Sequence, residues 1–273
     1  MKVLRTAGFY LVAGVFFLWA VFPFYYAVVT SLKTGFAVMT PTLWPREPSF
    51  ANYVHIFQLG VGRNVLNSVI VATLTVLFAG LVSLPAAYAL SRVSFRGRST
   101  LLVTMLGATM FPQAAVLSGL FSVIRGLGLY NTWWGLIFSY LLFTVPFTVW
   151  VLTAFMRELP QELEEAAIID GAGPWTIVTR IFLPLLAPAM AATGLLAFIA
   201  AWNEFLFALT FTLDNAARTV PVAITVFGGS SSFMPPYGNI MAASVVVSAP
   251  LVILVLVFQR WITSGLTMGA VKG

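Results

Sequence analysis

Long apolar runs separated by short polar stretches form the main pattern of this chain. Each run is close to the roughly 20 residues that a helix needs to cross about 30 Å of hydrocarbon. Only helices and closed barrels satisfy their backbone polar groups in lipid, and continuous rather than alternating runs favour helices. The sequence therefore predicts an all-α polytopic membrane protein with a single transmembrane domain over residues 1–273. Its six predicted helices cover residues 9–31, 65–91, 100–122, 133–156, 182–209 and 239–260.

Composition agrees with a membrane protein. The chain is 60% hydrophobic and 8% charged, whereas a soluble domain carries about 25% charged residues. It has no cysteine, which excludes a disulfide scaffold, a thiolate metal site and a cysteine nucleophile. The first apolar run is too long for a signal-peptide core and lacks a convincing small-residue cleavage site, so we expect it to be retained as a span.

The basic residues indicate orientation. They lie at the ends of apolar runs, which fits membrane topology better than a nucleic-acid patch. With the N-terminus inside, the inner set is Lys2, Arg5, Arg92, Arg96, Arg98, Arg157, Arg180, Arg260 and Lys272. The outer set is Lys33, Arg46, Arg63, Arg125 and Arg218. The larger inner set predicts that both termini are cytoplasmic, that membrane lipid surrounds the chain and that no nucleic acid binds.

No sequence pattern supports an enzymatic function. The sequence contains no G-x-x-x-x-G-K-[ST], no HExxH pair, no dinucleotide-binding fingerprint and no Ser/His/Asp arrangement. Its one histidine, His55, lies in an amphipathic stretch of a predicted external segment, 33–63, where a surface or packing role is typical. We therefore expect no catalytic residue, no metal and no cofactor in this chain.

A few polar side chains fall within the predicted spans. A charge at the membrane centre costs roughly 2.5–3.5 kcal/mol on insertion scales, so such groups must face protein or water. As candidates for lining a transport route we take Asn67, Gln113, Trp202, Asn203 and Glu204. Gln113 follows Pro112, which should kink its helix. Interhelical hydrogen bonding is an equal alternative, and Glu204 in particular fits a polar lock near the outer boundary as well as it fits a pathway.

The stretch 158–184 interrupts this apolar pattern. Four of the chain's eight acids fall within eight residues, Glu158, Glu162, Glu164 and Glu165. The pattern predicts a cytoplasmic loop of two short helices in which the acids serve mainly the helix dipole and solvation. Such a charge run is either a solvated connection or a docking site for another protein.

Residues of the first short helix favour docking. Leu163, Ala166, Ala167 and Asp170 share one face, and the alanines leave room for a close neighbour. Gly171 follows where a left-handed C-terminal cap is needed.

The spacing in this loop resembles the EAA signature of permease subunits in bacterial ABC importers. The matching positions are Glu165-Ala166-Ala167, Gly171, Ile181 and Leu183-Pro184. Further motifs resemble the carbohydrate-uptake branch, and in particular its maltose-type and trehalose-type permease subunits. These motifs are SLKT at 31–34, NY at 52–53, FP at 111–112, AWNEF at 201–205 and GLTMGAVKG at 265–273.

The resemblance implies a permease subunit of an ATP-driven importer that moves a di- or oligosaccharide across a bacterial or archaeal cytoplasmic membrane. It implies pairing with a homologous second permease subunit, two cytoplasmic ATPase subunits that hold ATP and Mg²⁺, and an extracytoplasmic sugar-binding protein. The ATPase-coupling residues that it implies are Glu165, Ala166, Ala167, Asp170 and Gly171.

Other functions remain as alternatives. An importer of the same type for amino acids or peptides would share the loop, although the AWNEF and tail motifs argue against it. An ion-coupled secondary transporter would favour several buried acids and broken helices, and only Glu204 qualifies. A membrane scaffold or insertase would leave the loop spacing unexplained.

Overall fold

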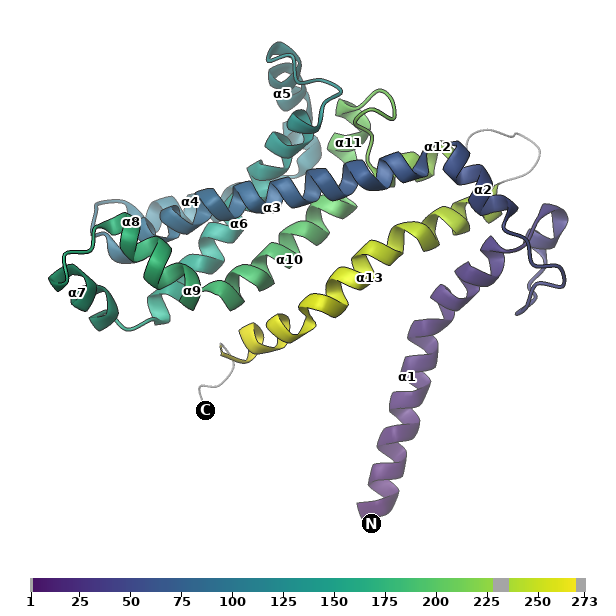
Figure 1. The fold of residues 1–273 in the computed structure, drawn as a ribbon, viewed down its shortest axis with the longest axis horizontal. Helices are drawn as coiled ribbons and strands as arrows, with labels where there is room; N and C mark the ends of the chain where they lie inside the picture. The colour runs from purple at the N-terminus through teal and green to yellow at the C-terminus, as the bar shows by residue number, and fades with distance from the viewer. Residues whose placement is uncertain (1, 228–235, 269–273) are drawn as a thin grey trace. The chain divides into compact units, whose positions relative to one another are not determined.

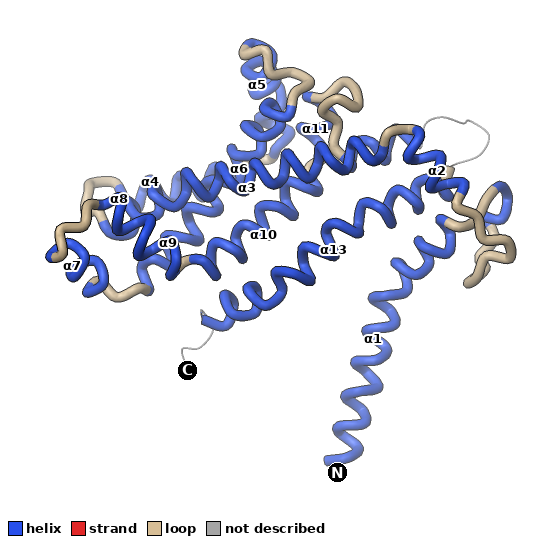
Figure 2. The backbone as a smooth tube through the Cα atoms, viewed as in Figure 1, coloured by secondary structure: helices blue, strands red, loops and turns tan. Residues whose placement is uncertain are grey.

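The computed structural model describes residues 2–227 and 236–268, and every regular element in those ranges is helical (Figures 1 and 2). Side chains are described for residues 5–226 and 236–259. The last five residues of the GLTMGAVKG tail lie outside the described ranges. The chain forms two compact units, one of residues 1–63 with 222–250 and the other of residues 64–221 with 251–273.

Four of the described helices are long and apolar enough to cross a membrane. They are α1 (Lys2–Ser31), α3 (Val61–Arg92), α6 (Trp133–Glu158) and α13 (Tyr237–Met268). Two bent helix pairs raise the number to six if each pair is one span. The predicted all-helical membrane architecture, with four to six candidate spans, is therefore confirmed.

The first bent pair falls in the predicted span 100–122. Helix α4 (Arg98–Thr109) and helix α5 (Gln113–Gly126) meet at 95°. Pro112 precedes α5 with an extended backbone, φ −60° and ψ 130°, and its missing N–H cannot continue the ladder of α4. The kink expected at this proline is thus a complete break in the helix.

The second bent pair covers most of the predicted span 182–209 and ends at Asn203. Helix α8 (Pro174–Thr176), the π-helical turn η2 (Ile177–Phe182) and α9 (Leu183–Leu185) form its first arm. Helix α10 (Ala187–Asn203) forms the second arm at 79°. The predicted run is divided again after Asn203, since α11 (Leu206–Phe211) is a separate short helix.

A small apolar core holds the first unit together. It joins the short helices α2 (Ala51–Gln58) and α12 (Val220–Phe227) to the beginning of α13. Its members within that unit are Ile56, Val61, Ala223, Ala242 and Ala243. Three of these five are alanines, which lets the helix backbones approach closely.

Two motifs far apart in the sequence form one hydrogen-bonded corner beside this core. Asn52 Nδ2 donates to the carbonyl oxygens of Ser31 and Lys33, both at 2.7 Å. The hydroxyls of Ser31 and Tyr53 are also 2.7 Å apart. The NY pair of α2 therefore fixes the chain just after α1 ends, where the SLKT motif lies.

The buried side chain of Lys33 also stabilises this corner. Its side chain is 2% exposed, and Nζ donates to the carbonyl oxygens of Thr40 at 3.0 Å and Thr42 at 2.8 Å. Nζ also lies 5.4 Å from the centre of the Tyr26 ring. Burial lowers the pKa of Lys33 from its ordinary value. The Lys33 ammonium thus joins the end of α1 to the extended segment that follows the 3-10 helix η1 (Gly35–Met39).

We expect Gly238→Ala to destabilise the protein. A Cβ at Gly238 would lie 2.7 Å from Asn52 Nδ2 and 2.9 Å from its Oδ1, and this amide is already held by two hydrogen bonds. Overpacking of this kind costs about 1–3 kcal/mol. Thermal unfolding of the purified protein in detergent measures the loss. Gly8→Ala is the control, because no atom lies within 4 Å of its Cβ position. Equal melting of the two variants would contradict the expectation.

Candidate functional site

The loop between α6 and α10 contains a short capped helix. Helix α7 (Glu162–Ile169) ends at Asp170, and Gly171 follows with φ +80°. The N–H of Gly171 donates to Ile168 O at 3.0 Å, and the N–H of Ala172 donates to Ala167 O at 2.9 Å. These two bonds form a Schellman cap, which needs a left-handed residue at that position. The predicted cap at Gly171 is confirmed.

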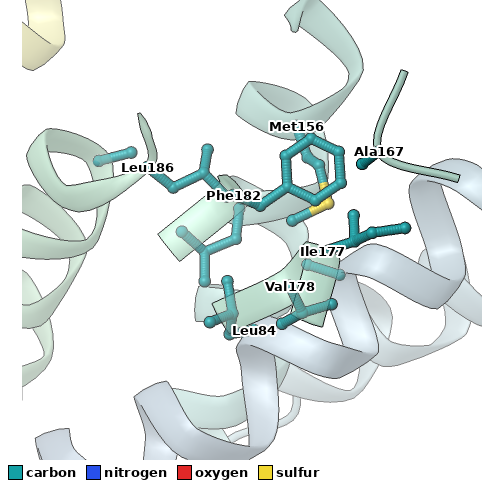
Figure 3. Close-up of a cluster of buried hydrophobic side chains, with 10 residues drawn as sticks. Leu84, Met156, Ala167, Ile177, Val178, Phe182 and Leu186 are labelled. Carbon is teal, nitrogen blue, oxygen red and sulfur yellow. The ribbon is translucent and has the colours of Figure 1, made fainter. Parts of the chain in front are cut away.

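A buried apolar cluster lies beneath the loop (Figure 3). We call it the loop cluster. Its members come from α3, α6, α7, η2 and α10, so it joins the loop to three long helices. They are Leu84, Ala87, Leu152, Met156, Ala167, Ile177, Val178, Phe182, Leu186 and Ala189. The loop is therefore packed onto the helix ends and is not a free connection.

Ala167 is the residue through which α7 enters this cluster. Its side chain is 7% exposed, whereas Leu163, Ala166 and Asp170 of the predicted docking face are exposed. Among these four residues, Ala167 thus faces the chain's own core, while the other three remain available at the surface. Glu165 is exposed as well.

We expect Ala167→Leu to destabilise the protein by about 1–3 kcal/mol, because the larger side chain overpacks the loop cluster. Ala166→Leu is the matched control, since the neighbouring side chain is exposed. Thermal unfolding of the purified protein in detergent should separate the two variants. If both melt like the wild type, the cluster does not constrain α7 as the packing indicates.

Polar contacts fasten α7 to the same helix ends. Glu164 Oε1 accepts a hydrogen bond from the Tyr88 hydroxyl at 2.6 Å. Its Oε2 lies 3.5 Å from Arg92 Nε, with both side chains largely buried. Glu164 therefore does more than favour the helix dipole and solvation, which is all that the sequence predicted for it. Its partners, Tyr88 and Arg92, are 76 and 72 residues away in sequence, so no local pattern identifies them.

The loop exposes three large apolar side chains beside its exposed acids. Ile169 is 85% exposed, Trp175 69% and Ile168 57%. Apolar side chains exposed on a loop that the sequence places in water are candidates for a protein contact. Sequence reasoning missed these three residues because it looked for small residues on one helix face. Their signal was present as large apolar residues on both sides of the glycine cap.

Asn67, the first of the predicted pathway candidates, is 1% exposed. Its Nδ2 donates to the carbonyl oxygens of Asn215 at 3.1 Å and Arg218 at 2.9 Å. Its Oδ1 accepts from Trp133 Nε1 at 3.1 Å. The amide thus ties α3 to α6 and to the segment after α11.

The remaining pathway candidates divide between buried and exposed positions. Trp202 is 2% exposed and stacks on Phe198 with 5.7 Å between ring centres. Glu204 is 9% exposed, and its two oxygens accept the backbone N–H groups of the first turn of α11. Asn203 and Gln113 are exposed. No group of three or more metal-ligating side chains gathers anywhere in the described part of the chain.

Comparison with known proteins identifies a family and relatives that this chain resembles. Residues 6–268 match the family described as "Binding-protein-dependent transport system inner membrane component". The chain is 44% identical over 255 residues to the trehalose/maltose transport system permease protein MalG of Thermococcus litoralis, covering 92% of this chain and 91% of that protein. It is 40% identical over 268 residues to the trehalose transport system permease protein SugB of Mycobacterium tuberculosis, covering 91% of this chain and 97% of that protein.

A solved structure shares the fold. It is the crystal structure of a bacterial ABC transporter involved in the import of the acidic polysaccharide alginate, and one of its chains superposes with a TM-score of 0.82 at 22% identity. The alignment covers 95% of this chain and 98% of that one.

Proposed function

Because the chain belongs to the family of inner membrane components of binding-protein-dependent transport systems, we propose that it is the ABC importer subunit through which a di- or oligosaccharide crosses the cytoplasmic membrane. Its relatives named above serve trehalose and maltose transport, which supports this substrate class. The structural observation that carries the proposal is the loop that packs on the loop cluster and exposes the large apolar side chains of Ile168, Ile169 and Trp175. A permease without a nucleotide site must receive its energy through such a contact.

The assembly that we propose has four kinds of partner. A homologous second permease subunit completes the passage, and two ATPase subunits hold ATP and Mg²⁺ beneath the pair. A sugar-binding protein delivers substrate on the outer side. One ATPase receives α7 of this chain through its exposed residues. We assign this contact to Glu165, Ala166, Asp170 and Gly171 together with Ile168, Ile169 and Trp175. Ala167 supports the contact from inside the chain.

Placing a charge among the exposed apolar side chains of the loop tests the docking. We expect Ile169→Glu to reduce co-purification of the ATPase subunits and ATP-dependent uptake together, because a charge buried without a partner costs about 3–5 kcal/mol. Phe36→Glu is the control, since Phe36 is 79% exposed but lies in the segment predicted to be external. Full ATPase recovery with Ile169→Glu would exclude this surface as the contact.

The substrate class needs its own measurement. The complete transporter with its binding protein, reconstituted in liposomes that contain ATP, should import labelled trehalose or maltose and not labelled amino acids or dipeptides. Omitting the binding protein should abolish the uptake. Import of an amino acid or a dipeptide in place of either sugar would select the alternative importer class.

A further inference from the structure

We propose that Arg92, Glu164 and Tyr88 form a coupling clamp, whose task is to make α3 and α6 follow any displacement of the loop. The inference rests on the proposed function and adds residues to it that lie inside the chain and do not touch a partner. They are positioning residues, since they act through the helix that docks.

Arg92 is the centre of the clamp. It is the last residue of α3, and its side chain is 5% exposed. One guanidinium nitrogen, Nη2, donates to the carbonyl oxygens of Met156 at 3.0 Å and Leu159 at 2.7 Å. Met156 O is one of the last carbonyls of α6, where the helix has few donors of its own, and Leu159 is the residue that follows the helix. A cation is also favoured at this negative end of the helix dipole.

The other side of the same guanidinium faces the loop. Its Nε lies 3.5 Å from Glu164 Oε2, and its central carbon lies 5.4 Å from the centre of the Phe182 ring in η2. Arg92 Nε makes no hydrogen bond with the described residues, so its contact with Glu164 is an ion pair. One planar group therefore contacts the end of α6, the docking helix α7 and the π-helical turn that follows it.

Tyr88 gives the clamp a second contact with Glu164. It lies one turn before Arg92 on α3, and its hydroxyl binds the second oxygen of Glu164 at 2.6 Å. Its ring packs against the same Phe182 at 5.8 Å. One oxygen of Glu164 thus accepts a hydrogen bond from Tyr88 and the other forms an ion pair with Arg92, and both partners lie on α3. A carboxylate held in this way cannot rotate freely, so a push on α7 is transmitted to α3.

The apolar loop cluster alone would not couple a displacement of α7 to α3 and α6. Apolar contacts are non-directional and allow side chains to slide over one another, whereas charge-assisted hydrogen bonds fix both distance and orientation. The cluster therefore explains why the loop stays attached. The clamp explains why its movement would be passed on to two particular helices.

The test uses the complete transporter in liposomes, with second permease, ATPases and binding protein. The variants are Tyr88→Phe, Glu164→Gln and Arg92→Lys, and the matched control is Glu162→Gln, an exposed acid on the same helix. The readout is the number of ATP molecules hydrolysed per sugar imported. We expect the clamp variants to keep their ATPases and hydrolyse ATP while uptake falls about tenfold or more, the effect of losing one charge-assisted hydrogen bond.

Two outcomes would overturn the clamp. The first is an unchanged ratio of ATP to sugar in all three variants. The second is loss of the ATPases in parallel with uptake, which would mean that the three residues only shape the docking surface. If Arg92→Lys does not assemble, Tyr88→Phe decides, because it removes a single oxygen and keeps the ring on Phe182. Failure of the wild-type permease to retain ATPases would instead refute the proposed function.

Discussion

Replacing Gly171 by aspartate should reduce ATP-dependent uptake on the order of a hundredfold while the permease itself remains folded. Gly171 has φ +80°, and among non-glycine residues aspartate and asparagine tolerate this region best. Apart from Gly171 itself and its two neighbours in the chain, no described residue has an atom within 4 Å of the position that a Cβ would occupy. The chain alone therefore accommodates the side chain. A large loss must come from a partner that covers the position and buries the new charge, at about 3–5 kcal/mol.

Two further substitutions at Gly171 separate backbone strain from charge. Gly171→Ala adds no charge and should cost about 1–2 kcal/mol of stability, because alanine is strained at positive φ. Gly171→Asn matches aspartate in size and backbone tolerance, and should retain more uptake than aspartate does. Uptake, thermal unfolding and ATPase co-purification are measured on the same preparations. If aspartate and asparagine behave alike in uptake, charge burial at this position is not the reason for the loss.

Local signals in the sequence were enough to predict much of the loop. A glycine after an alanine-rich turn predicted a left-handed cap, and the structure has it at Gly171. Pro112 predicted a kink, and the helix breaks there. Such features depend on one or two neighbouring residues, because backbone geometry is decided locally. The long apolar runs were likewise enough for the membrane class.

Features that depend on pairing could not be read in this way. Arg92 was interpreted as one of the inner basic residues that orient the chain, which says nothing about its contact with Glu164. Ala167 was grouped with its exposed neighbours, because helical periodicity gives a shared face without saying what lies against it. The direction of each side chain is decided by packing of α7 on η2 and on the ends of α3 and α6. These contacts join segments distant in sequence.

For Glu204 the structure favours one of the two interpretations that the sequence left open. The sequence allowed either a pathway residue or a polar lock. In the structure both carboxylate oxygens are used, accepting from Phe207 N–H at 2.8 Å and Ala208 N–H at 3.0 Å. These donors belong to the first turn of α11, where no intrahelical acceptor exists. The carboxylate therefore behaves as a helix cap at the break between α10 and α11, which favours the lock.

Removing this cap should have a large effect on stability. We expect Glu204→Ala to destabilise the permease by about 2–4 kcal/mol, because Phe207 and Ala208 are fully buried and their N–H groups lose their acceptors without gaining water. Glu204→Gln keeps one acceptor oxygen and should lose about half as much. Thermal unfolding of the detergent-purified permease measures both changes.

The neighbouring side chain provides the control. Asn203 is exposed, and the hydrogen bond it donates, to Ile199 O at 2.9 Å, lies within its own helix, so Asn203→Ala should leave unfolding almost unchanged. The sugar concentration for half-maximal uptake then distinguishes the two roles of Glu204. A cap predicts that Glu204→Gln lowers the amount of folded transporter and leaves that concentration unchanged. A pathway residue predicts the reverse, with normal unfolding and a shifted concentration dependence, and that result would return Glu204 to the transport route.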